Sequence, residues 1–542
     1  MAITLNYTGQ FGRVRELIDL MRRTCQSPDV TPLALTVLKD VESMYLMLTA
    51  DQDRCLQAVF DGVDIGQASG VNLWRYHLLS NGAAAALGAG DLNSAEDLLG
   101  KMHAHRDGAR RLDRCGYHYY RSWLAMLRRD VVEAHQEQKT ALRLAIESGC
   151  PFYEVLCRLA LAEIFHELGD ERRTVINLRR VRRLARGIDN RLMEYMAFST
   201  YAHIAFAHGR KRSGLNALRY AFGLGREHGF THFVWWQPRV MAELCVQALK
   251  AGIEVDYAQN LIRGRGLMPD LPPITVDEWP WPIRIRSFGE FQVFKHGQPL
   301  ETVAKPQQKP IELLKVLVAF GAVDVKEPEL AADLWPRIDK DYAHRSLTTT
   351  LHRLRKVLAH DQAIGLKHGR LSIDSNCCWL DIHALDRVSD EIDEALGHAR
   401  PRPPECLVLE LTDRLFDIYR GPFMAGEGDR PRYLPARERY RNKFLRAAGE
   451  LARFWEEQKR WDQVARLYAR GLEADPLAEG LYRRLMLCYR QLGRHAEAVD
   501  VYDSCRRVLA GQCGAEPSAE TTAIYRSVVD ALGEDSDSQR YG

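Results

Sequence analysis

Cationic and hydroxyl side chains, which can form hydrogen bonds and ion pairs, recur at helical spacing between Asp341 and Arg370. On a helix turning by about 100° per residue, four leucines fall on one narrow stripe. These leucines are Leu347, Leu351, Leu354 and Leu358. The opposite side carries Arg345, Thr348, Thr349, His352, Arg353 and Lys356. The spacing indicates either a helix that reads DNA or an ordinary amphipathic helix with a solvated basic face.

A short hairpin is predicted after this helix. Two alternating segments, 364–366 and 371–373, flank a tight turn at 367–370. The cationic side chains of the turn are Lys367, His368 and Arg370. A helix fixed by leucines beside a basic hairpin is what a major-groove reader needs if a wing is to reach the neighbouring minor groove or backbone.

The polar stripe can be divided by the chemistry of its side chains. Arg345 at the start and Lys356 near the end of the helix suit phosphates, which give salt-sensitive affinity and little specificity. Thr349, His352 and Arg353 are better placed for base edges, and a guanidinium can contact guanine with two hydrogen bonds. We therefore expect base reading to depend mainly on these three residues.

Length, composition and charge set wider limits. The 542 residues are enough for three or four domains, and a net charge of +3 requires any electrostatic footprint to be local. No P-loop, HExxH or GxSxG motif occurs, and the twelve cysteines show no metal-ligand spacing. We expect neither an enzyme nor a cofactor or metal.

Localisation is predicted from the same composition. Cysteines within apolar helical runs fit buried thiols in a reducing cytoplasm. A secretory signal is not found, and no apolar run approaches the ~20 residues of a membrane span. We expect a cytoplasmic protein without a membrane partner.

Residues 1–270 contain a short turn at a nearly fixed interval. The aspartates of four turns, Asp51, Asp91, Asp130 and Asp170, lie 40, 39 and 40 residues apart. Each turn follows one apolar helical stretch and precedes another. A helix pair of this length cannot bury its apolar face alone, so the pairs must stack into a tetratricopeptide-like α-solenoid.

Two aromatic clusters, 117–120 and 233–236, lie within these repeats. They could line a groove for a ligand or partner. Aromatic residues on repeat helices more often pack between repeats, and we favour that interpretation. The repeats are expected to bind a small-molecule or protein effector.

The composition changes at 271–282, where four prolines in twelve residues predict a linker. Strand-like alternation covers 283–294, and helices are predicted at 310–320 and 327–335. A seven-residue loop, 336–342, then leads into the leucine-striped helix and the hairpin. This order of strands, three helices and hairpin is typical of a winged helix-turn-helix with an N-terminal sheet.

Helical sequence resumes at Cys406. The segment 493–509 aligns with 459–475 at an offset of 34 residues, which is the tetratricopeptide period. The fold is therefore expected to be mainly α, with solenoid, winged helix and a second tetratricopeptide-like domain. A polar tail, 536–542, is expected to fray.

Residues 283–535 resemble the bacterial transcriptional activators of the antibiotic-regulatory-protein type. The matching motifs are RSFGEFQVFKHGQPL, LWP, RSLTTTLHRLRKVL, LDIHALD, YRGPFMAGE and ADPLAEGLYRRLMLCYRQLGRHAEAVDVY. Residues 1–270 are less specifically similar to the helical repeats of MalT-like regulators. The resemblance implies an OmpR-like winged helix at 283–385 and an activator domain at 386–535.

The resemblance also implies partners: double-stranded DNA, RNA polymerase and a second copy of the chain on DNA. In relatives the loop before the third helix contributes to polymerase contact, which here concerns Arg337, Asp339 and Lys340. MalT-like relatives usually carry a nucleotide-binding module before the repeats, whereas this sequence begins in the repeats. That departure implies regulation without a nucleotide, or a truncated form. The alternative is a repeat scaffold whose winged helix contacts protein.

Overall fold

The computed structural model describes residues 1–105, 108–185, 190–300, 308–397, 402–428 and 430–538, without the side chains of Lys340 and 531–538. The chain divides into two compact units, Met1–Trp279 and Pro280–Gly542. This division falls inside the segment predicted as a linker, where Val276 and Trp279 are nevertheless buried. The protein is mainly α-helical, as predicted.

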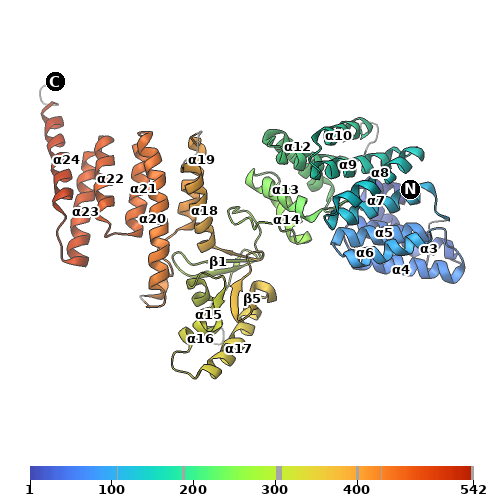
Figure 1. Cartoon of the computed structure of the whole chain (residues 1–542), viewed down its shortest axis with the longest axis horizontal. Helices are drawn as coiled ribbons and strands as arrows, with labels where there is room; N and C mark the ends of the chain where they lie inside the picture. The colour runs from blue at the N-terminus through green and yellow to red at the C-terminus, as the bar shows by residue number, and fades with distance from the viewer. Residues whose placement is uncertain (106–107, 186–189, 301–307, 398–401, 429, 539–542) are drawn as a thin grey trace. The chain divides into compact units, whose positions relative to one another are not determined.

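The first unit is built from antiparallel helix pairs that stack in sequence order (Figure 1). The pairs are α1 (Ala2–Tyr7) with α2 (Phe11–Thr24), α3 (Pro32–Leu48) with α4 (Gln52–Ser69), α5 (Arg75–Ala89) with α6 (Leu92–Ala104), α7 (Arg111–Leu127) with α8 (Val131–Glu147), α9 (Pro151–Glu167) with α10 (Glu171–Ala185), α11 (Arg191–Ala207) with α12 (Lys211–His228), and α13 (Pro238–Lys250) with α14 (Val255–Arg265).

The predicted turns are the turns inside these pairs. The first helix ends in a left-handed residue, such as Ala50 (φ 63°) or Gly90 (φ 81°), and an aspartate then caps the second helix. Asp51 accepts from the Arg54 N–H at 3.4 Å, Asp91 from Ser94 at 3.1 Å, Asp130 from Glu133 at 2.9 Å and Asp170 from Arg173 at 2.9 Å. The repeat period is thus set by a recurring chain reversal.

Most side chains of the two aromatic clusters lie in the core of the first unit, while Tyr117, His118 and Val234 are half-buried. Tyr119, Trp235 and Trp236 are at most 4% exposed, and the rings of Tyr119 and Trp235 lie 5.4 Å apart. Trp123 donates through Nε1 to the Trp236 carbonyl at 3.0 Å. Burial between helices, rather than an open aromatic groove, is therefore confirmed for these side chains.

The second unit begins with a four-stranded sheet in the order β3-β2-β1-β7. Its strands are β1 (Ile283–Arg286), β2 (Gln292–Lys295), β3 (Gln298–Pro299) and β7 (Cys378–Leu380). β1 pairs antiparallel with β2 and parallel with β7. The segment 283–294, predicted to be strand-like, forms two strands, β1 and β2, because the chain reverses at Gly289 (φ 87°).

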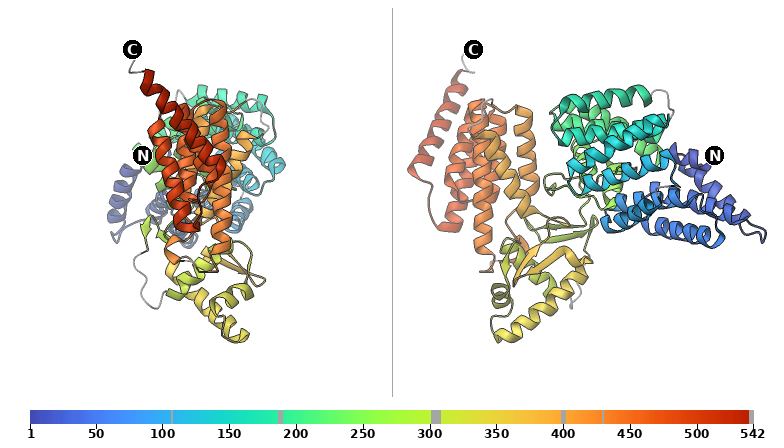
Figure 2. Two further views of the ribbon diagram at one scale, coloured as in Figure 1. Left: turned by 90° about the vertical axis from the view of Figure 1, so that its left-hand side faces the viewer. Right: turned by 45° about the vertical axis from the view of Figure 1, so that its right-hand side comes forward.

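Three helices follow: α15 (Gln308–Ala319), α16 (Glu327–Leu334) and α17 (Lys340–Leu358). They lie close to the predicted helices and gather at one end of the second unit, beside a second sheet (Figure 2). This sheet has the order β4-β6-β5, with β4 (Val325–Lys326), β5 (Ile364–Lys367) and β6 (Arg370–Ile373). A short η3 turn, Asp361–Ala363, joins α17 to the hairpin.

The remaining helices stand beside one another in sequence order (Figure 1). They are α18 (Asp381–Leu396), α19 (Glu405–Ile418), α20 (Leu434–Glu457), α21 (Trp461–Ala474), α22 (Glu479–Gln491), α23 (His495–Cys513) and α24 (Ala519–Ser538), with a short η4 turn at Ala425–Glu427. α21 and α23 begin 34 residues apart, as the sequence repeat predicts. The predicted frayed tail is described only to Ser538, at the end of α24.

The sheet and the C-terminal helices share one hydrophobic core. Phe288 follows β1 and packs its ring 5.0 Å from Tyr419 and 5.5 Å from Tyr440. The buried carboxylate of Asp381 accepts from the backbone N–H and Oγ of Ser287 and from the Phe288 N–H. Because α18 runs through residues 385 and 386, the predicted domain boundary there lies within a helix.

Among the described residues, no helix combines the length and apolarity needed to cross a membrane.

Candidate nucleic-acid interface

Helix α17 is held against the second unit by its leucine stripe. Leu347, Leu351, Leu354 and Leu358 are at most 3% exposed and belong to the shared core. The N-cap is Asp339, whose side chain accepts from the Asp341 N–H at 3.0 Å, and the left-handed Ala359 (φ 53°) ends the helix. Burial of one stripe leaves the opposite face to solvent.

The side chains predicted to contact DNA lie on that solvent face. Those on the helix, all exposed, are Arg345, Thr348, Thr349, His352, Arg353 and Lys356. Thr348 and Thr349 donate to the carbonyls of His344 and Arg345 at 3.2 and 3.1 Å, so their hydroxyls are directed toward the helix backbone. Within the described part of the chain, the side chains of Arg345, His352, Arg353 and Lys356 form no hydrogen bond or ion pair. Their donors therefore remain available to an anionic partner.

One basic residue of α17 has a structural role that the sequence did not reveal. Arg355 donates through Nε and Nη2 to the Ile364 carbonyl at 3.0 and 2.6 Å. Ile364 is the first residue of β5, so the bond fixes the hairpin to the helix. A basic residue next to Arg353 and Lys356 thus faces the protein rather than solvent.

The hairpin forms the wing that was predicted. His368 (φ 51°) and Gly369 (φ 70°) make the tight two-residue turn, as in hairpins with two left-handed central residues. Lys367 and His368 are exposed at its tip. Arg370 is only 42% exposed, and its Nη1 lies 2.9 Å from Asp324 Oδ2 and 3.0 Å from the Asp324 carbonyl. The charge of Arg370 is therefore partly neutralised next to the turn of the wing.

The wing and helix α17 are connected through Glu327, the first residue of α16. Its backbone N–H donates to the Gly369 carbonyl at 2.9 Å, and its carboxylate lies 2.8 Å from His344 Nδ1. Glu327 is 9% exposed. Glu327 thereby contacts both the turn of the wing and the N-terminal part of α17. Sequence reasoning missed this contact, since it joins three elements.

The loop before α17 is shorter than predicted. The segment 336–342 was expected to be a loop, but α17 begins at Lys340, so Asp341 and Tyr342 belong to its first turn. Arg337 and Asp339 are exposed in the connection, and the Lys340 side chain lies outside the described residues. The helix starts early because Asp339 is an effective N-cap.

Within the described residues, no group of three or more histidine, cysteine or acidic side chains could hold a metal ion. Asp381 is a buried acid at the start of α18, where burial raises its pKa to about 6 although hydrogen bonds from Ser287 and Phe288 oppose the shift. Its three donors mark it as a structural connection between β1 and α18.

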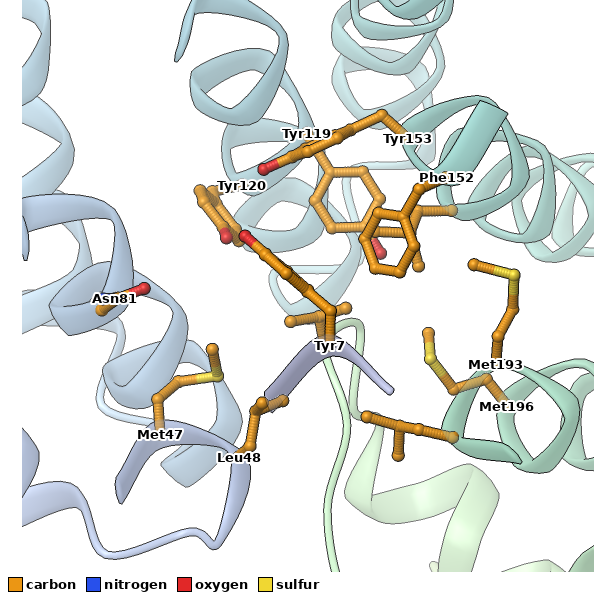
Figure 3. A pocket seen from close by; sticks show the side chains of 13 residues that line it. Tyr7, Met47, Leu48, Asn81, Tyr119, Tyr120, Phe152, Tyr153, Met193 and Met196 are labelled. Carbon is orange, nitrogen blue, oxygen red and sulfur yellow. The ribbon is translucent and has the colours of Figure 1, made fainter. Parts of the chain in front are cut away.

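The interior of the first unit contains a small tyrosine-lined cavity. Tyr7 of α1 lies among Tyr119, Tyr120 and Tyr153, which come from α7 and α9 (Figure 3). The cavity has a volume of about 30 Å³, which is space for roughly one water molecule. Asn190 fixes Tyr7 by donating to its carbonyl at 2.8 Å. The cavity is too small to serve as an effector site in this conformation.

The geometry of the second unit agrees with comparisons to known proteins. Residues 381–529 match the family described as "Bacterial transcriptional activator domain", from the start of α18 into α24. This part of the second unit is thus similar to a bacterial transcriptional activator domain. The family resemblance drawn from the sequence motifs is thus confirmed by an independent match.

Two similar curated proteins are regulatory proteins of Streptomyces. Regulatory protein DnrI of Streptomyces peucetius is 23% identical over 271 residues, covering 46% of this chain and 93% of that protein. Regulatory protein AfsR of Streptomyces griseus is 25% identical over 265 residues, covering 48% of this chain and 25% of that protein. The match thus spans a quarter of AfsR but nearly all of DnrI. Both proteins are similar to about half of this chain.

A solved structure titled "Mycobacterium tuberculosis EmbR in complex with low affinity phosphopeptide" is also similar. It shows 20% identity and a TM-score of 0.35, and the match covers 46% of this chain and 66% of that one.

Proposed function

We propose that this protein is a sequence-specific DNA-binding transcriptional regulator that activates by contacting RNA polymerase. The observation that carries the proposal is the solvent face of α17, whose cationic side chains have no partner among the described residues. This face lies opposite the buried leucine stripe and beside a basic wing. The activator domain and the regulatory relatives support the same function. No catalytic role is part of the proposal.

The recognition helix would enter the major groove with its solvent face toward the bases. Arg353 and His352 have free donors for base edges, while Arg345 and Lys356 suit phosphates. Thr349 would contact bases mainly through its methyl group and hydroxyl lone pairs, since its proton is directed to the Arg345 carbonyl. Thr348 flanks this stripe.

The wing would contact the neighbouring minor groove or its phosphates through Lys367 and His368. Arg370 would contribute less, because it is held by Asp324. Glu327 keeps the wing and α17 at a fixed separation, so both can engage one face of the duplex. If two copies bind side by side, the operator should contain two copies of the half-site.

Selection of bound sites from random duplex DNA by the full chain tests the proposal. We expect an enriched motif of one or two half-sites, and salt-dependent affinity for it. Recovery of unselected sequence, with equal affinity for the motif and for scrambled DNA, would contradict sequence-specific binding. The spacing of half-sites reports whether two copies bind together.

Contact with RNA polymerase is assigned to the connection between α16 and α17, with Arg337, Asp339 and Lys340 as candidates. Arg337 and Asp339 are exposed, although Asp339 also caps α17. Replacement of Arg337 by Ala should lower transcription in a purified system while leaving operator affinity unchanged. Loss of operator affinity would assign Arg337 to DNA instead.

The helical repeats of the first unit are proposed to sense an effector that regulates the second unit. Because residues 280–542 have their own core, they can be compared with the full chain for affinity to the selected operator. A difference that changes with added cell extract is expected. Equal affinities under both conditions would count against this regulation.

A scaffold that binds proteins through its winged helix is the alternative function. A protein-docking helix would more often expose apolar residues at positions 345, 349, 352 and 356, where this chain has Arg, Thr, His and Lys. DNA selection separates the two functions.

A further inference from the structure

The strongest local charge in the first unit lies on α10 and α12. Together these helices contain ten lysines and arginines against two glutamates, a net charge of +8 in a chain whose total is +3. A local excess of this size attracts acidic partners. It is separate from the winged helix and plays no part in the DNA contacts proposed above.

A groove of about 690 Å³ lies between α10 and the pair α11 and α12. Its aromatic side chains are Phe198, Tyr201 and Tyr220, which are 38%, 40% and 43% exposed. The rings of Phe198 and Tyr220 lie 4.5 Å apart, and Val175 and Leu178 of α10 face the same space. Three partly exposed rings in one concavity are an apolar surface of the kind that binds ligands or peptides.

The acidic side chains that line the groove are already paired. Glu171 forms an ion pair with Arg210. Glu194 lies 3.0 Å from Arg191 Nη1 and accepts from the Tyr220 hydroxyl at 2.8 Å.

Two arginines at the groove, in contrast, are available. Arg179 and Arg182 line it, are exposed, and make no hydrogen bond or ion pair among the described residues. Both come from α10, one helical turn apart. The groove therefore offers an apolar interior and an unneutralised guanidinium edge.

We infer that this groove binds an acidic amphipathic segment of a partner protein. Apolar side chains of the segment would cover Phe198, Tyr201 and Tyr220, while its carboxylates would pair with Arg179 and Arg182. A DNA backbone fits less well, because phosphates and sugars offer few apolar groups for the three rings. The inference deepens the effector role proposed for the repeats and rests on it.

The test begins with selection of 16-residue peptides from a random display library on the full chain. We expect enriched peptides with at least two acidic residues and with Leu, Phe or Tyr at helical or alternating spacing. A synthetic, fluorescein-labelled copy of the most enriched peptide then serves as the probe for anisotropy measurements. Enrichment of basic peptides, or of none, would overturn the inference.

Two matched double variants identify the site. Arg179→Glu with Arg182→Glu should weaken binding of the probe by about ten-fold or more, since both new glutamates would repel the carboxylates of the probe. Arg172→Glu with Arg183→Glu makes the same charge change on exposed positions of α10 that do not line the groove, and should stay within about three-fold of the unmodified protein. Equal loss in both variants would show general attraction to polyanions and overturn a specific groove.

The apolar part of the site is tested by Tyr201→Ala, with circular dichroism to confirm that the helices remain folded. We expect the probe to bind at least about five-fold more weakly, whereas unchanged binding would remove the aromatic surface from the site. Random duplex DNA that displaces the probe from the unmodified protein would identify nucleic acid as the occupant. The measurements contain no operator, so failure of peptide binding is distinguishable from failure of DNA recognition.

Discussion

The carboxylate of Glu327 lies 2.8 Å from Nδ1 of His344, across the junction between α16 and α17. Through its backbone N–H, the same glutamate also contacts Gly369 in the wing. One residue therefore connects α17 to the wing, and the separation of these two elements, both proposed to contact DNA, should depend on it.

Replacement of Glu327 by Gln should weaken operator binding several-fold relative to Glu329→Gln. Both changes remove one negative charge, but the first removes the ion pair with His344, whereas the second removes only the exposed pair of Glu329 with Lys326 at the start of α16. The pair itself contributes no more than about 1 kcal/mol, because the His344 side chain is 63% exposed. Anisotropy titrations of the selected operator measure the difference. Equal affinities of the two variants would assign Glu327 a purely local role.

Replacement of Arg353 by Ala should cost about 1–3 kcal/mol of operator binding and relax preference at one base pair. Lys356→Ala is the matched comparison, since a phosphate contact should weaken binding to all sequences alike and lower the salt slope by about one. Affinities for the operator and its single-base variants distinguish the two roles. Equal loss on specific and random DNA after Arg353→Ala would rule out base reading.

Phe288→Ala should destabilise the winged helix and the activator helices together. Its ring is buried against Tyr419 and Tyr440 within a core that both share, and removal of such a ring costs about 3–5 kcal/mol. Urea unfolding of residues 280–542 should show one transition at a lower midpoint. Two separate transitions would mean that the two halves fold independently.

The stability of the second unit should depend on pH through Asp381. Its pKa is raised to about 6, above the value of about 4 expected in the unfolded chain, so the folded state binds the proton more tightly. The contribution of this carboxyl group is therefore full below about pH 4 and declines as the pH rises toward 6, by roughly 3 kcal/mol at most.

Asp381→Asn removes this titration and also loses acceptors for Ser287 and Phe288. The variant should be less stable, and its deficit should shrink as the pH rises from 4 to 7. Urea midpoints of both proteins across this range provide the measurement. A constant deficit would show that folding does not raise the pKa of Asp381.

Local patterns predicted most of the helical architecture. Capped turns such as Gly90-Asp91 fixed the repeat period, and the leucine stripe placed α17 because burial follows helical spacing. Contacts between distant segments were not predictable. The reversal at Gly289 depends on Asp381, which lies more than 90 residues away, and β4 has only two residues, too few for a periodic signal.

The candidate interface was predicted only in part, because some of its side chains are held by contacts between distant segments. Exposure of Arg353 and His352 follows from the helix alone, whereas Arg355 looked equally basic and is held by the Ile364 carbonyl. The pairing of Arg370 with Asp324 requires β4 to lie beside β6. The early start of α17 was missed because the capping role of Asp339 was not recognised.

The shared core around Phe288 has a consequence for promoter architecture. If the winged helix cannot rotate relative to the activator helices, these helices extend from the bound duplex in one fixed direction around its axis. If RNA polymerase contacts the bound protein at the connection between α16 and α17, as proposed, activation should recur when about 10–10.5 base pairs are inserted between operator and promoter, and fail at half that insertion. Helical phasing of the promoter would then be a direct readout of how rigidly two folds are joined.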